Sequence, residues 1–228
     1  PGVSSVREGA EVRFVLQEIE AWIPFAVGLA SLALSAIVWR RRGAPGSTPF
    51  LVQNLGIALW SMAVAFELMS PDLAEKIFWS KVKYVGVVVV PVAWLGFAVE
   101  YTGSRRWLNP TNLAVLGAVP LLTLALVWSN ELHHLMWRDV SLEQVGESSF
   151  RHLKAGPWYW IWATFSYSVF GFGWLLVLRA AIRARSLFRE QNAVILLAGL
   201  VAVGANALYL SGAWPGRHFD VTPFGFAL

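Results

Sequence analysis

The chain has 228 residues, of which 57% are apolar and only 14% are charged, and its formal net charge is +4. Soluble domains carry about 25% charged residues, so this composition excludes a soluble globular enzyme and a disordered tail. Cysteine is absent, which excludes disulfides, thiolate metal sites and cysteine nucleophiles. The sequence therefore predicts an all-α, polytopic membrane helix bundle.

Residues 1–21 precede the first apolar run, and they are predicted either to form an outer interfacial segment that leads into it or to be a frayed terminus. Six apolar runs then have the length needed to cross about 30 Å of hydrocarbon. They cover residues 22–39, 51–69, 84–102, 110–128, 158–178 and 191–211. A seventh apolar stretch starts near Val221 and runs to Leu228. We therefore expect one seven-helix domain over residues 22–228, with six full spans and the start of a seventh.

The density of basic residues predicts the orientation in the cell membrane. The turns at 40–50, 103–109 and 179–190 hold nine arginines in 30 residues. The segments on the other face also hold nine basic residues, but spread over 73 residues together with eleven acids. Because short basic loops remain in the cytoplasm, we expect the arginine-rich turns inside and the N-terminus outside. The longest loop, 129–157, is then outside, where it is expected to form a lid or a small hairpin.

Charged residues at the outer ends of two spans suggest an ion pair. Glu67 lies near the end of the second run, and Lys81 and Lys83 lie where the third begins. An ionisable group inside a membrane is costly unless it is paired or hydrated, so Glu67 is predicted to pair with Lys83 or Lys81. Such a pair is either structural or the polar floor of an outer-facing ligand pocket, and the lysines can also reach the interface by snorkelling.

Other polar residues have competing interpretations. Asn206, inside the sixth run, is expected to hydrogen-bond to another helix, with ligand contact as the less favoured alternative. Glu100 is expected to pair with Arg105 and Arg106 at the inner interface. Adjacent histidines do not share a helix face, so a metal site at His133 and His134 is not favoured. No catalytic motif is found, and no cofactor is expected.

The order of several short motifs resembles the N-terminal seven-helix membrane region of bacterial and archaeal sensor histidine kinases. The resemblance covers about residues 22–228, and its individual motifs gain specificity from their order and spacing. The motifs are Leu59-Trp60, Phe66-Glu67-Leu68, Phe78-Trp79-Ser80-Lys81, Tyr84-Val85-Gly86, Glu100-Tyr101-Thr102-Gly103, Arg106-Trp107-Leu108, Ser129-Asn130, His134-Leu135-Met136-Trp137, Gly156-Pro157-Trp158-Tyr159-Trp160, Arg189-Glu190-Gln191, Asn206-Ala207-Leu208-Tyr209 and Asp220-Val221-Thr222-Pro223.

The resemblance implies a sensory module whose seventh span continues into cytoplasmic output domains, such as a histidine kinase or a diguanylate cyclase, and a homodimer. Its expected partners are membrane lipids and an unknown small or hydrophobic ligand, with no nucleic acid. No catalytic residue is assigned within these 228 residues. We take as candidate ligand contacts Trp60, Glu67, Lys81, Lys83, Asn206, Tyr209 and Asp220.

Other classes of membrane protein remain as alternatives. A transporter or channel needs a polar path through the membrane, and few ionisable residues lie deep in any predicted span. A structural subunit of a larger complex is a second alternative. A retinal photoreceptor needs a lysine in the last span, most of which lies beyond the sequence.

Overall fold

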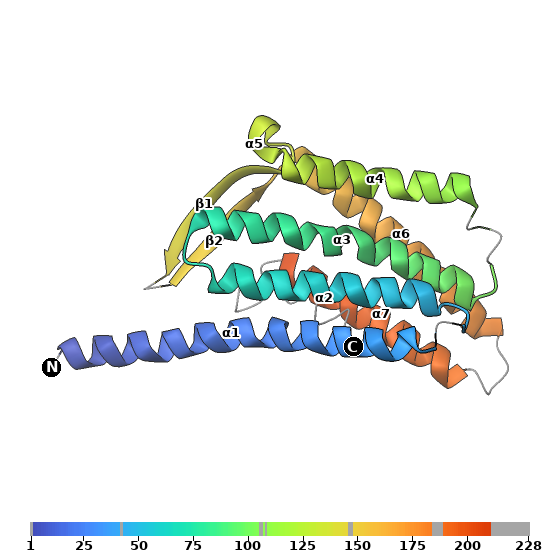
Figure 1. Cartoon of the computed structure of the whole chain (residues 1–228), viewed down its shortest axis with the longest axis horizontal. Coiled ribbons are helices and arrows are strands. Elements are labelled where there is room, and N and C mark those ends of the chain that lie inside the picture. The colour runs from blue at the N-terminus through green and yellow to red at the C-terminus, as the bar shows by residue number, and fades with distance from the viewer. Residues whose placement is uncertain are drawn as a thin grey trace.

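The computed structural model describes residues 2–41, 43–104, 107, 109–145, 148–183 and 189–210, and they form a mostly helical bundle (Figure 1). The long helices are α1 (Gly2–Trp39), α2 (Ser47–Met69), α3 (Leu73–Tyr101), α4 (Pro110–Trp128), α6 (Pro157–Arg183) and α7 (Arg189–Leu210). Between α4 and α6 lie the short helix α5 (Asn130–His133) and the strands β1 (Trp137–Val145) and β2 (Ser148–Ala155).

Five helical segments in this part of the chain are long and apolar enough to cross a membrane. They are Ala21–Trp39, Ser47–Met69, Leu73–Tyr101, Pro110–Trp128 and Pro157–Arg183. The sixth predicted span corresponds to α7, whose apolar stretch Asn192–Val201 is shorter. The predicted start of a seventh span, from Val221 onward, lies outside the described residues.

Two helices, α1 and α3, begin several turns earlier than their apolar runs predict. Helix α3 starts at Leu73 rather than near residue 84, because its first three turns carry charged side chains that break the apolar run without breaking the helix. Residues 2–20 are helical and continue directly into the first span as one 38-residue helix (Figure 1). The segment before the first span therefore follows the axis of α1.

The fold is not entirely α-helical, since the long outer loop contains a β-hairpin. Strands β1 and β2 pair antiparallel from Trp137 opposite Ala155 to Val145 opposite Ser148. The register shifts between Trp137 and Asp139, which is the geometry of a β-bulge. Of the two forms expected for this loop, the structure has the hairpin.

Helix α3 lies at the centre of the bundle, where it packs against α2, α4 and α6. The helix that approaches α3 most closely at a glycine is α2. A Cβ added to Gly86 would overlap the main-chain carbonyl oxygen of Gly56 and would lie 2.9 Å from the main-chain nitrogen of Trp60. In the apolar part of α3, 67% of residues are buried, compared with 22% in α4. Among the described residues, most of the surface of α4, and likewise of α1 and α6, is therefore not covered by other helices.

The connections divide the bundle into two ends. The hairpin end carries the turn between α2 and α3, helix α5 and the two strands (Figure 1). The arginine end carries the exposed residues Arg40, Arg41, Arg179 and Arg183. At the arginine end Glu100 accepts a hydrogen bond from the Gly46 N–H at 2.9 Å, which ties the turn before α2 to the end of α3. Its expected partners Arg105 and Arg106 lie outside the described residues.

Candidate ligand-binding site

A buried ion pair joins α2 to α3 near the hairpin end. The Lys83 ammonium donates to Glu67 Oε2 at 3.0 Å, and the two side chains are only 10% and 13% exposed. The buried Lys76 ammonium also donates to the main-chain carbonyl of Glu67, at 3.1 Å. Of the two pairings that the sequence leaves open for Glu67, the structure therefore has the one with Lys83.

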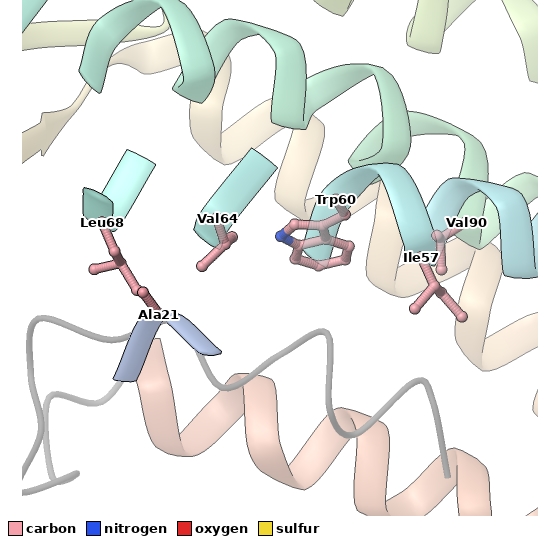
Figure 2. Close-up of a cluster of buried hydrophobic side chains, with 6 residues drawn as sticks. All are labelled: Ala21, Ile57, Trp60, Val64, Leu68 and Val90. Atoms are coloured by element: carbon pink, nitrogen blue, oxygen red, sulfur yellow. The ribbon is translucent and has the colours of Figure 1, made fainter. Parts of the chain in front are cut away.

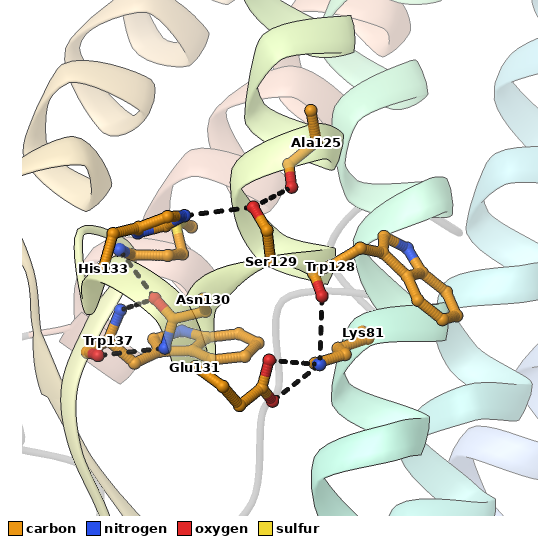
Figure 3. Close-up of polar contacts among 9 residues, drawn as sticks. Lys81, Ala125, Trp128, Ser129, Asn130, Glu131, His133 and Trp137 are labelled. Atoms are coloured by element: carbon orange, nitrogen blue, oxygen red, sulfur yellow. Dashed lines mark hydrogen bonds and ion pairs between the residues drawn. The ribbon is translucent and has the colours of Figure 1, made fainter.

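Lys81 points to a different neighbour. Residues two apart on a helix do not share a face, so Lys81 lies on the side of α3 that meets α4 and α5. Its ammonium pairs with the Glu131 carboxylate at 2.6 Å and donates to the Trp128 carbonyl at 3.3 Å (Figure 3). This pair fastens α5 to α3 and is separate from the Glu67–Lys83 pair.

Trp60 lies seven residues before Glu67, two helical turns away on the same side of α2. Its side chain is 6% exposed and belongs to an apolar cluster with Ala21, Ile57, Val64, Leu68 and Val90 (Figure 2). Figure 2 shows Ile57, Trp60, Val64 and Leu68 in a row along α2. Trp60 is therefore part of the core that holds α2 against its neighbours.

Three candidate ligand contacts come from the last part of the chain, and only the side chain of one of them is described. Asn206 of α7 accepts a hydrogen bond from the Tyr167 hydroxyl of α6. This contact has the form of the helix-to-helix bond expected from the sequence. The side chain of Tyr209, and the whole of Asp220, lie outside the described residues.

Asn130 organises the start of the outer loop, a role that the sequence analysis missed. Its amide nitrogen donates to the Trp137 carbonyl at 3.0 Å. Its amide oxygen accepts from the N–H groups of Met136 at 2.9 Å and Trp137 at 3.0 Å (Figure 3). Met136 and Trp137 are almost fully buried, in a cluster that includes Tyr84 of α3 and Trp162 of α6.

The hairpin returns to the bundle through an equally tight contact. The Gly156 N–H donates to the Met136 carbonyl at 2.9 Å, and a Cβ at Gly156 would overlap the carbonyl of Leu135. The indole of Trp158 then donates to the buried Thr123 hydroxyl of α4 at 3.0 Å. Both ends of the hairpin are thus attached to the helices, and the motifs around Asn130 and Gly156 have a structural explanation.

His133 has a local role in this loop. Its Nδ1 accepts from the Leu135 N–H at 3.0 Å. Its Nε2 lies 3.1 Å from the Ser129 hydroxyl (Figure 3). That hydroxyl donates to the Ala125 carbonyl at 2.7 Å, so the network assigns the proton to Nε2. Within the described residues, no group of three histidine, aspartate or glutamate side chains is placed to hold a metal ion.

Comparison with protein families accounts for nearly the whole chain. Residues 23–228 match the model of the N-terminal 7TM region of histidine kinase. The chain belongs to this family. Among curated proteins, no match to the chain is found. As a member of the histidine kinase 7TM family, the chain is a membrane-embedded, multi-pass sensor region, and it is not the catalytic part of such a kinase.

Proposed function

We propose that this 7TM region senses an extracellular or membrane-borne ligand. Binding would rearrange its helices, and this change would carry the signal to a cytoplasmic output domain. The observation that supports this most directly is the Glu67–Lys83 pair, buried between α2 and α3 near the hairpin end. A buried pair strongly favours the helix arrangement in which its two charges meet, because separating them leaves a desolvated charge. A ligand that interacts with either charge can therefore favour another arrangement.

The proposed ligand site lies among the hairpin-end halves of the helices, with Glu67 and Lys83 as polar anchors and Trp60 in the apolar wall. Pockets of this kind are mostly apolar with a few polar groups. The other proposed ligand contacts are Lys81 and Asn206, which here meet Glu131 and Tyr167, together with Tyr209 and Asp220. The attached hairpin would serve as the outer cover of the site.

The orientation is proposed from charge: the arginine end faces the cytoplasm and the hairpin end faces outward. Because the chain contains no cysteine, single cysteines give an unambiguous test. We expect an impermeant maleimide to label Ser141→Cys in intact cells and Arg41→Cys only after the membrane is opened. Labelling of Arg41→Cys in sealed cells would reverse the proposed orientation.

The signalling proposal is tested with the full-length protein in vesicles, by measuring phosphate transfer from ATP to its kinase domain. Glu67→Gln and Lys83→Met each break the pair, and we expect each to change basal phosphorylation at least about tenfold, because a difference of 1.4 kcal/mol between two states shifts their ratio by that factor. Leu132→Ala, at an 87% exposed position outside the pair, is the matched control. Folded variants with wild-type phosphorylation would refute the relay.

We also propose that the protein works as a homodimer, as expected for a kinase of this class. Disulfide cross-linking between single-cysteine variants in the native membrane tests this. A monomeric full-length protein with normal phosphorylation would contradict it.

A further inference from the structure

Aromatic rings near the hairpin end form a continuous strip across four helices. The contacts run from α1 to α2 and on to α3 and α4, with ring centroids 4.6–6.4 Å apart. We call this the aromatic strip, and its members are Trp22, Phe25, Phe66, Phe78, Trp79 and Trp128. Residues far apart in the sequence are therefore brought to one level of the bundle.

The strip faces outward and marks a change in chemistry along the helices. Trp22, Phe78 and Trp128 are 56%, 49% and 48% exposed. On the hairpin side of the strip lie the exposed charges Asp72 and Glu75 at the start of α3. At the level of the strip itself, the Lys81 ammonium pairs with Glu131 and lies 6.0 Å from the centre of the Trp128 ring. Exposed rings between an apolar face and charged groups are typical of the layer of lipid headgroups.

The arginine end shows a second boundary at a consistent distance. On the three helices with the most exposed faces, we mark each boundary by the tryptophan, proline or arginine that flanks the apolar stretch. These residues are Trp22 and Trp39 of α1, Pro110 and Trp128 of α4, and Trp160 and Arg179 of α6. At 1.5 Å per residue these pairs are separated by about 26, 27 and 29 Å along their helices. Any tilt shortens the distance between the two boundaries further.

We propose that the aromatic strip binds the headgroup layer of the bilayer leaflet at the hairpin end and that the bundle is matched to a bilayer thinner than average. A typical hydrocarbon layer is about 30 Å thick, which exceeds all three helix distances. A thicker bilayer must then thin around the protein, or the helices must change their tilt. The partner is a phospholipid surface. This inference requires only that the chain spans a bilayer, so it does not depend on the proposed ligand or orientation.

Nitroxide labels on single cysteines test the depth of the strip, using the whole chain in dioleoyl-phosphatidylcholine vesicles. The labelled variants are Phe78→Cys in the strip, Leu122→Cys on the exposed face of α4 and Ser141→Cys in the exposed part of β1. We expect the Leu122 label to be accessible to oxygen but not to a water-soluble nickel complex, and the Ser141 label to show the reverse. The Phe78 label is expected between them.

The other outcomes for the Phe78 label overturn the proposal. Full accessibility to nickel would place the strip in water, and oxygen accessibility as high as at Leu122 would place it in the hydrocarbon interior. Protection from both reagents would show that a second copy or another protein covers the strip.

Bilayer thickness is tested separately with phosphatidylcholines whose monounsaturated chains have 14, 18 or 22 carbons. We expect the thermal midpoint of the wild-type chain to be highest with 14 carbons and at least about 5 °C lower with 22, because mismatch costs free energy for each ångström. The variant Phe78→Leu/Trp128→Leu keeps the strip apolar but removes its affinity for headgroups, and should at least halve this difference. Leu122→Ala is the control that should retain it. Equal midpoints in the three lipids would refute the thickness match.

Discussion

Asn130 holds the main chain of Trp137 from both sides, donating to its carbonyl and accepting from its N–H, each at 3.0 Å. The amide oxygen also accepts from the Met136 N–H at 2.9 Å. Asparagine is suited to this role because its side chain carries one acceptor and two donors at the same end. The start of the loop after α4 is therefore held by the Asn130 side chain, in addition to the Lys81–Glu131 pair.

Replacing Asn130 with alanine should destabilise the protein by about 2–4 kcal/mol, because three main-chain groups around buried side chains would lose their partner. Thermal unfolding in detergent micelles measures the change. Leu132→Ala, two residues away and 87% exposed, should alter the unfolding free energy by less than about 0.5 kcal/mol. Equal stability of the two variants would show that the Asn130 network contributes nothing.

Gly86→Ala should be severely destabilising, because the added Cβ meets the main chain of Gly56 and Trp60 and forces α2 and α3 apart. We expect a loss of at least about 3 kcal/mol in unfolding free energy, or failure to fold. Gly117→Ala in α4 is the matched control, since nothing lies within 4 Å of its added Cβ. Alanine favours a helix interior by about 1 kcal/mol, so this control should be neutral or stabilising.

The Glu67–Lys83 pair should show strong coupling in a double-mutant cycle. Glu67→Gln removes the carboxylate charge that the buried Lys83 ammonium meets, and Lys83→Met removes the ammonium from which Glu67 Oε2 accepts its hydrogen bond. Each single variant should lose about 3 kcal/mol of unfolding free energy, whereas the double variant should lose less than the sum of the two. Additive losses, measured by thermal unfolding in the same detergent, would show that the two side chains are not coupled.

Acid should weaken the attachment of α5. The hydrogen bond from Lys81 is the main cause that holds the pKa of the Glu131 carboxyl below its usual range, while burial opposes it. Because the folded pKa is the lower one, the contribution to stability is complete above the usual glutamate range. It is lost as the pH falls through that range towards the folded pKa.

The expected acid effect is below about 1 kcal/mol, since Glu131 is 59% exposed and solvent screens the pair. Thermal midpoints measured from pH 7 to pH 3 should fall more for the wild-type chain than for Glu131→Gln. A steeper fall for the variant would contradict the assigned direction of the pKa shift.

The sequence by itself determined the membrane class, the approximate positions of the apolar helices and the family resemblance. Apolar length is a local property, so the run at 110–128 coincides with α4, and the acid at Glu67 signalled a need for a partner. The extra helical turns before residue 84 in α3 were not predicted, because charged residues end an apolar run but not a helix.

Only the tertiary structure decided which partners meet. From the sequence, Lys81 and Lys83 were equally possible partners of Glu67. They lie on different sides of α3, so Lys81 meets Glu131 and Lys83 meets Glu67. Asn130 and Gly156 stood in motifs whose roles depend on main-chain groups several residues or more away. The aromatic strip likewise combines rings from four helices. Periodicity along one chain cannot reveal such contacts, because they arise from the rotation and depth of each helix relative to its neighbours.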